Sequence, residues 1–219
     1  NENTTSSRQL IIHEVMGRNC GWLTAATALE YRKILNKKEF IPELLIDKYK
    51  WDIHAIYIPE KEIDFDLECD RLNEIMDKHD CVNIFLSEGA GLEAIIAEMK
   101  SNNEEIEYDA FGHVRLDEIN PGLWFAKNLK QKLNAHKVLI QKSGYFARSA
   151  VPISKDIDLI KKTAIFAVKS ALKSISGVVG LDEDKNNQME CIEFERIKGG
   201  KPFDINLDWY KDMLSEIEN

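Results

Sequence analysis

Several features that would assign a protein to a class at once are missing from this 219-residue sequence. No apolar run is long enough to span a bilayer, and the polar start at residues 1–7 has no signal-peptide hydrophobic region. An excess of positive charge is also missing, because 38 Asp and Glu against 29 Lys and Arg give a net charge of −9. We therefore expect no nucleic-acid or membrane partner, and any bound anion must meet a local cluster of cations.

The sequence also lacks paired cysteines. The four cysteines form no CxxC motif, and no histidines lie near them at zinc-site spacing. They are Cys20, Cys69, Cys81 and Cys191. This pattern indicates reduced thiols in a cytoplasmic protein, and we predict no metal ligands in the chain. There is no internal repeat and no low-complexity tract. The chain begins without Met, so we expect it to be a piece of a longer protein.

What the sequence does contain is an alternation of short apolar runs and helical patterns. Strands are predicted at residues 10–15, 55–58, 81–86 and 138–141, with a further strand at 189–197 and a turn at Gly199-Gly200. Helices are predicted at 22–34, 66–78, 92–99, 123–133 and 207–217, and a long one capped by Ser154 and closed by Gly177. Such alternation predicts an α/β fold, with a mainly parallel sheet flanked by helices on both faces.

Ligands of open parallel sheets bind beyond the carboxyl ends of the strands, so the segments after the predicted strands are the candidate sites. The first such segment begins Met16-Gly17-Arg18, where glycine allows a tight turn and Arg18 supplies a cation. The helix that follows would offer N–H groups and its positive dipole end to an anion. The alternative is a simple turn with a solvated arginine.

Two further segments carry charge at the same edge. Glu88 is an acceptor-only carboxylate that matches the hydroxyl donors of a sugar, although a first-turn acid favoured by a helix dipole is the alternative. Lys142, Tyr145 and Arg148 lie within seven residues and suit a phosphate monoester, unless they form a solvated surface loop. Cations in two segments and a carboxylate in the third predict a site for a phosphorylated sugar.

At these residues the sequence resembles the phosphofructokinase family. The run EVMGRNCG at residues 14–21 resembles that family's loop for fructose 6-phosphate, and Ser87-Glu88-Gly89 resembles its sugar-binding glutamate. The run KSGYFARS at 142–149 is similar to the version in pyrophosphate-dependent members, whereas ATP-dependent relatives typically have a His-containing loop there. The resemblance extends from about residue 6 to about residue 180.

The resemblance implies roles for the first two segments. Met16 and Gly17 would line the fructose 6-phosphate site, and Arg18 would be the catalytic residue that stabilises charge on the phosphoryl group in transfer. Glu88 would accept hydrogen bonds from the sugar hydroxyls.

The resemblance also implies roles for the third segment. Tyr145 and Arg148 would hold the 6-phosphate, with Lys142 as a helper. Arg8 lies about one residue from the position of a family arginine that reaches across a subunit interface, so we leave it out of the site. His13 and His54 lie in or beside predicted strands, and we interpret both as packing residues.

The family's donor elements do not occur in this sequence. It has no GGDD or GGDG loop and no Thr-Ile-Asp segment, whose aspartate would be the general base. The resemblance therefore implies that residues 1–219 are the fructose 6-phosphate-binding part of a phosphofructokinase, as one domain or as two lobes with 178–219 a C-terminal extension. The donor-binding N-terminal part, with its Mg²⁺, would lie outside the chain, which should not turn over alone.

The implied reaction is reversible and glycolytic: it converts fructose 6-phosphate to fructose 1,6-bisphosphate with pyrophosphate as donor. An ATP-dependent enzyme and a non-catalytic sugar-phosphate-binding regulatory domain are the alternatives. We also expect a homo-oligomer, because a part of a larger sheet protein exposes strand edges that tend to pair.

Overall fold

The computed structural model describes residues 7–44, 46–110, 112, 114–115, 119–197 and 201–218. The chain divides into two compact units. The first, called here the sheet unit, comprises Asn1–Tyr145 and Lys201–Asn219, and the second, called the hairpin unit, comprises Phe146–Gly200. This division does not coincide with an extension at 178–219, because the last segment of the chain belongs to the sheet unit.

The sheet unit contains four parallel strands in the order β2-β3-β1-β4. They are β1 (Gln9–Val15), β2 (Ala55–Tyr57), β3 (Cys81–Ser87) and β4 (Lys137–Lys142). The predicted strands are thus confirmed to within one residue at each end, and so is their parallel arrangement. Val15 lies opposite Ser87 and Glu14 opposite Lys142, so these strands end together at one edge of the sheet.

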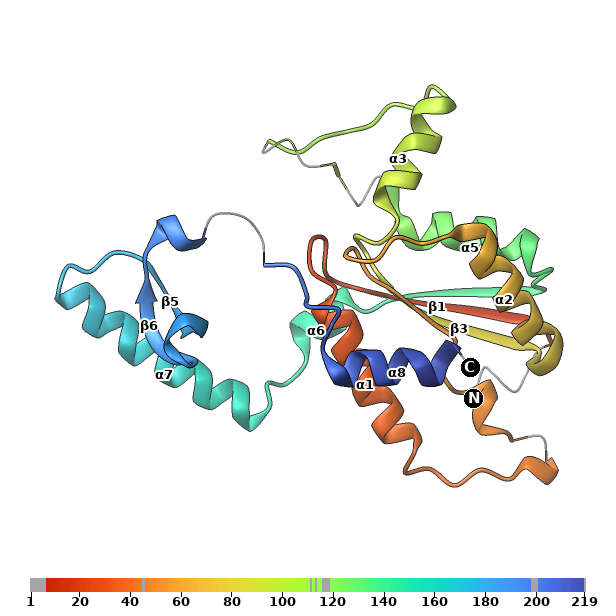
Figure 1. The fold of residues 1–219 in the computed structure, drawn as a ribbon, viewed down its shortest axis with the longest axis horizontal. Helices are drawn as coiled ribbons and strands as arrows, with labels where there is room; N and C mark the ends of the chain where they lie inside the picture. Colours follow the sequence, from red (N-terminus) through yellow and green to blue (C-terminus); the bar gives the residue numbers. More distant parts are fainter. Residues whose placement is uncertain are drawn as a thin grey trace. The chain divides into compact units, whose positions relative to one another are not determined.

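Helices cover both faces of this sheet, as the α/β prediction requires (Figure 1). On one face lie α1 (Trp22–Leu35) and α8 (Asp208–Glu218), and on the other α2 (Phe65–His79), α3 (Leu92–Ser101) and α5 (Pro121–Lys132). The short 3-10 turns η2 (Pro42–Leu44) and η3 (Lys48–Lys50) lie between α1 and β2. The result is a three-layer α/β/α arrangement.

Alternation along the strands explains the two layers of core. Leu10 and Ile12 are completely buried and pack with Leu72 of α2 and Phe125 of α5. Side chains that point to the other face pack with α1 and α8, as Phe85 does. Local signals set the helix ends: the Asp64 side chain accepts a hydrogen bond from Leu67 N at 3.1 Å and so caps α2.

The hairpin unit contains a long helix and a two-stranded antiparallel sheet. Its elements are α7 (Ser154–Leu172), β5 (Val178–Asp182), η4 (Glu183–Lys185), β6 (Gln188–Ile192) and η5 (Phe194–Ile197), and α6 (Gly144–Ser149) spans the boundary with the sheet unit. The sequence missed β5, and the predicted strand at 189–197 is wrong in its second half, where η5 forms. The predicted turn at Gly199-Gly200 lies outside the described residues.

The predicted ends of α7 are also corrected. Ser154 is the first helical residue rather than the cap, because Ile153 takes the cap position and donates its N–H to Asp156 Oδ2 at 3.2 Å. The helix ends at Leu172, where the Lys173 N–H turns back to the carbonyls of Ser170 and Ala171, so Gly177 does not close it. No helix among the described residues is long and apolar enough to cross a bilayer.

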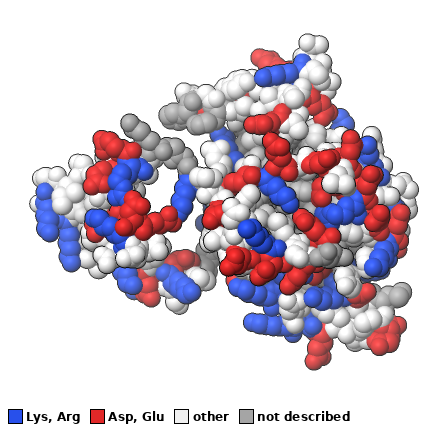
Figure 2. All heavy atoms as spheres, viewed as in Figure 1, with Lys and Arg blue, Asp and Glu red and all other residues white. Residues whose placement is uncertain are grey.

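The hairpin unit exposes much of its apolar surface. No apolar side chain in the described part of residues 146–200 is fully buried, and Ile160, Val168 and Leu172 are 60%, 61% and 82% exposed. It also contains an ion pair in which the exposed Arg196 meets both carboxylate oxygens of the buried Asp182 at 2.7 Å. On the face drawn in Figure 2, Lys and Arg are interspersed with Asp and Glu, without an extended patch of one sign among the described residues.

Candidate functional site

The topology of the sheet changes direction at its carboxyl edge. β1 and β3 are neighbours, yet α1 follows β1 on one face while α3 and α5 follow β3 on the other (Figure 1). The two connections leave the sheet toward opposite faces, and open α/β sheets bind ligands at such a point. The segments predicted to carry chemistry follow β1, β3 and β4, so they leave the sheet at this edge.

The segments after β1 and β3 are in direct contact. Gly17 N donates a hydrogen bond to Glu88 Oε1 at 3.1 Å, and Ser87 Oγ donates to the Gly17 carbonyl at 2.5 Å. Glu88 N donates in turn to the Val15 carbonyl at 3.0 Å. The predicted Met16-Gly17-Arg18 and Glu88 segments are thus one structural feature, in which the glutamate is fixed by the backbone of the arginine-bearing loop.

Gly89 allows this close approach. A Cβ built on Gly89 would lie 1.8 Å from the carbonyl oxygen of Arg18, which is far inside van der Waals contact with a backbone atom. Only a residue without a side chain lets the two loops meet in this way.

Arg18 is the predicted catalytic cation, and the structure pairs it with an acid that no local motif indicates. Its Nη1 lies 3.5 Å from Asp109 Oδ2, and each side chain is one third exposed. Asp109 lies in the polar connection after α3, where nothing local indicates a role. A phosphate group that binds Arg18 must therefore compete with the Asp109 carboxylate.

Lys142, at the end of β4, faces a buried carboxylate. Its Nζ lies 3.4 Å from Oε1 of Glu14, the residue opposite it on β1, and Glu14 Oε2 accepts the Gly122 N–H at 2.9 Å. Glu14 is only 8% exposed and lies at the N-terminus of α5, where the helix dipole favours a negative charge. An acid inside the apolar run LIIHEV was the signal that could have predicted this role.

Tyr145 and Arg148 lie on α6, so the predicted loop is in fact a short helix. Gly144 packs against Met16, because a Cβ on Gly144 would lie 3.3 Å from Met16 Cγ. Tyr145 follows it and is 82% exposed. Arg148 lies one helical turn further along and belongs to the hairpin unit. The structure therefore brings Met16, Gly17, Arg18 and Glu88 together, places Lys142 and Tyr145 at the same edge, and assigns Arg148 to the other unit.

Arg8 lies at the opposite edge of the sheet, before β1. Its guanidinium donates to the carbonyls of Leu133 at 2.5 Å and Asn134 at 2.9 Å, and it forms an ion pair with Asp77 at 2.6 Å. These contacts join the start of β1 to the ends of α2 and α5.

His54 is a structural residue, as predicted. Its Nδ1 accepts the Asn83 N–H at 2.8 Å, and its Nε2 lies 3.0 Å from the Tyr49 carbonyl, so geometry assigns the proton to Nε2. Burial lowers the pKa of His54 to about 4, which keeps the ring neutral.

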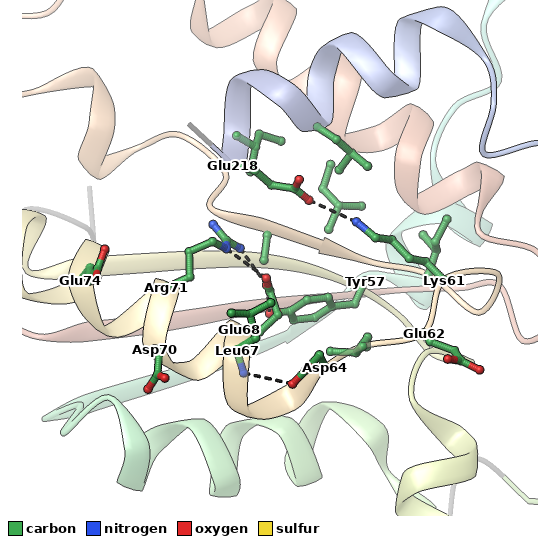
Figure 3. Close-up of a pocket in the computed structure, with 16 residues that line it drawn as sticks. Tyr57, Lys61, Glu62, Asp64, Leu67, Glu68, Asp70, Arg71, Glu74 and Glu218 are labelled. Atoms are coloured by element: carbon green, nitrogen blue, oxygen red, sulfur yellow. Dashed lines mark hydrogen bonds and ion pairs between the residues drawn. The ribbon is translucent and has the colours of Figure 1, made fainter.

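A separate cavity of about 570 Å³ lies beside β2, between α2 and α8 (Figure 3). Tyr57 donates its hydroxyl proton to Glu68 Oε2 at 2.8 Å, and Arg71 holds the same carboxylate at 2.8 Å. Burial raises the pKa of Tyr57 well above its usual value. Burial also acts to raise the pKa of Glu68, but the hydrogen bonds and charge of Arg71 lower it overall. None of the seven predicted site residues lines this cavity.

The described residues offer no metal site. No group of three or more His, Cys, Asp or Glu side chains among them converges in a way that could hold an ion. The site therefore consists of hydrogen-bonding and charged groups without a metal-ligand set.

The fold and site define an α/β domain of the doubly wound type, with polar and charged groups of two loops in contact at its switch point. The family model described as Phosphofructokinase matches residues 1–171, so the chain belongs to the phosphofructokinase family.

Curated relatives agree with this assignment. Among the relatives named pyrophosphate–fructose 6-phosphate 1-phosphotransferase are those of Methylomonas methanica (56% identical), Propionibacterium freudenreichii subsp. shermanii (50%) and Mastigamoeba balamuthi (49%). Each match covers 99% of this chain but only 53% to 54% of the relative. The chain thus spans about half the length of the curated relatives it matches.

Solved structures confirm the fold. Two crystal structures of pyrophosphate-dependent phosphofructokinases are similar, from Marinobacter aquaeolei (TM-score 0.56, 21% identity) and Nitrosospira multiformis (TM-score 0.58, 17% identity). They cover 98% and 99% of this chain, and this chain covers 49% of each.

Proposed function

We propose that this chain is the fructose 6-phosphate-binding half of a pyrophosphate-dependent phosphofructokinase, which converts fructose 6-phosphate to fructose 1,6-bisphosphate in glycolysis. The observation that carries the proposal is the contact between Gly17 N and Glu88 Oε1 at the switch point. It joins the two family motifs into one site in a chain that is 56% identical to a relative named for this reaction.

The chemistry of the side chains supports a sugar-phosphate acceptor. Glu88 has only Oε1 engaged by a hydrogen bond within the described residues, so Oε2 can accept from a sugar hydroxyl. Arg18 lies at the adjacent turn. When substrate binds, its guanidinium would break the ion pair with Asp109 and neutralise the negative charge on the phosphoryl group during transfer. Tyr145, Arg148 and Lys142 would supply a directed hydrogen bond and two positive charges for the 6-phosphate.

The donor side of the reaction is proposed to lie outside this chain. The names of the relatives favour pyrophosphate over ATP. Because the described residues hold no metal-ligand set, we assign no metal step to them, and Mg²⁺ would enter with the donor on the other half of the protein. The chain by itself is expected to show no phosphoryl transfer. A glycolytic enzyme acting on soluble metabolites is expected in the cytoplasm.

Calorimetric titration tests the acceptor site. We expect saturable binding of fructose 6-phosphate and no measurable binding of fructose, because the phosphate supplies the charge that Arg148 and its neighbours hold. Arg148→Ala should weaken binding by at least about tenfold, since a charge-assisted hydrogen bond is worth about 1.5–3 kcal/mol. Lys161→Ala removes an exposed cation elsewhere in the hairpin unit and is the matched control.

Three results would count against the proposal. Equal affinity for fructose and fructose 6-phosphate would show that the chain does not recognise the phosphate group. If the Arg148→Ala variant binds fructose 6-phosphate as tightly as the Lys161→Ala control, Arg148 does not belong to the site. A folded chain that binds neither compound would contradict an acceptor site in this half of the protein.

The exposed apolar residues of α7 support a homo-oligomer. Because Ile160, Val168 and Leu172 remain more than half exposed, the isolated chain is expected to self-associate. Size-exclusion chromatography with light scattering should give a mass above the 25.2 kDa of one chain. Replacing these three residues by glutamine should return the chain to that mass, and a compact wild-type monomer would contradict the expectation.

A further inference from the structure

A carboxylate outside the predicted site holds the far end of the acceptor loop, residues 16–21. Glu60 follows β2, and its Oε1 and Oε2 accept the Gly21 N–H at 3.0 and 3.1 Å. Oε1 also accepts the Phe203 N–H at 2.8 Å. One side chain thus joins three segments that are distant in sequence: the β2 exit, the end of the acceptor loop, and the segment that leads into α8.

The fit around Gly21 is close. A Cβ on Gly21 would lie 2.4 Å from Ile58 Cβ and 2.7 Å from Glu60 Oε2, so the loop rests directly on the β2 exit. Gly21 is also the N-cap of α1, a helix without a side-chain cap and without an acid in its first turn. Glu60 therefore supplies, from another element, the negative charge that the N-terminus of α1 lacks. The sequence predicted that this helix end would be offered to an anionic ligand, and the structure places the Glu60 carboxylate against the Gly21 N–H at that end.

The segment that ends in α8 is firmly attached at the same point. Phe203 is 5% exposed, and its ring packs on those of Trp209 and Tyr210 at centroid distances of 5.7 and 5.1 Å. Next to Glu60, Lys61 forms an ion pair with Glu218 at 3.2 Å, shown as a dashed line in Figure 3. The segment 201–218 therefore contacts the β2 exit at both of its ends.

We propose that Glu60 is a positioning residue for the acceptor loop, which it clamps through Gly21 and couples through Phe203 to the segment 201–218. The loop is then held at both ends, at Gly17 by Glu88 and at Gly21 by Glu60, with Arg18 between them. Its effect on substrate affinity rests on the function proposed above, whereas the clamp itself does not.

Three variants separate geometry from charge. Glu60→Ala removes both acceptors. Glu60→Gln keeps a carbonyl oxygen in the place of Oε1, which makes the bonds to both N–H groups, but it removes the charge. Glu62→Ala removes an exposed acid two residues away and is the matched control. Thermal unfolding of each variant shows whether it is folded at the temperature of the other measurements.

Hydrogen exchange measures the clamp without any ligand. In Glu60→Ala, the amides of Gly21 and Phe203 should exchange about tenfold faster than in the wild type, because each loses its charged acceptor. Glu60→Gln should retain most of the protection and Glu62→Ala all of it. Unchanged exchange at Gly21 in a folded Glu60→Ala variant would overturn the clamp.

Titration with fructose 6-phosphate measures the effect of the Glu60 clamp on substrate affinity. We expect Glu60→Ala to bind about tenfold more weakly, and Glu60→Gln to remain within about threefold of the wild type. If Glu60→Ala loses protection but keeps wild-type affinity, Glu60 does not position the loop for binding. If the wild-type chain fails to bind, the proposed function fails, and the exchange result still decides whether the clamp exists.

Discussion

Gly89→Ala is expected to weaken the binding of fructose 6-phosphate by about a hundredfold or more. The new Cβ would lie 1.8 Å from the Arg18 carbonyl oxygen, so one of the two loops must move by more than about 1 Å to restore van der Waals contact. A displacement of that size in a binding site can cost about two orders of magnitude. The free energy of unfolding should also fall by about 1–3 kcal/mol, as in other overpacked sites.

Calorimetry on the folded variant measures this effect, and Gly180→Ala is its control. A Cβ on Gly180 would meet its nearest neighbour, Ile192 Cδ1, at 4.0 Å, which is ordinary contact. This control should therefore keep wild-type affinity. Wild-type binding by Gly89→Ala would mean that the contact between the loops after β1 and β3 does not form the sugar-phosphate site.

Arg32→Ala is expected to lower the free energy of unfolding by about 3 kcal/mol. Arg32 Nε and Nη2 donate to the two oxygens of Asp52 at 2.8 and 3.2 Å, and its Nη1 meets Glu216 at 2.7 Å. The side chains of Arg32 and Asp52 are only 11% and 12% exposed, so removal of the guanidinium leaves a carboxylate buried without its main partner. The contact to Glu216 also ties α8 to α1.

Urea denaturation measures the loss, with Lys33→Ala as the neighbouring control. Lys33 pairs with Glu30 on the exposed surface, where such a contact contributes at most about 0.5 kcal/mol. The double variant Arg32→Met with Asp52→Asn should recover part of the loss, because it buries no unpaired charge. A loss in Arg32→Ala no larger than in Lys33→Ala would show that the contacts of Arg32 with Asp52 and Glu216 do not stabilise the fold.

Much of the sheet unit could be predicted because its signals are local. The apolar run before Met16 and the one before Ser87 each predicted a buried strand, and both strands end within one residue of the expected position. The hairpin unit was harder, because the apolar positions of α7 are periodic but its end depends on backbone contacts at Lys173 rather than on Gly177. Strand β5 is short and half exposed, so its sequence has no clear alternation.

The candidate site likewise contains residues that the sequence predicted and residues that it did not. Gly17, Arg18 and Glu88 were predicted because motifs carry them, and parallel strands bring motifs to one edge of the sheet. Asp109 and Glu60 were missed, since each acts on a residue far away in sequence and no spacing rule connects such partners.

The sequence by itself determined the alternation of strands and helices and the membership of the phosphofructokinase family, and it predicted the sheet edge at which the candidate site residues lie. Each of these depends on residue type and period within a short window. Only the tertiary structure decided that Glu88 is held by Gly17, that Arg18 faces Asp109, and that the last segment of the chain returns to the sheet unit. The physical reason is that hydrogen bonds and ion pairs between distant segments depend on which surfaces meet in the folded core, and that information is not contained in any one segment.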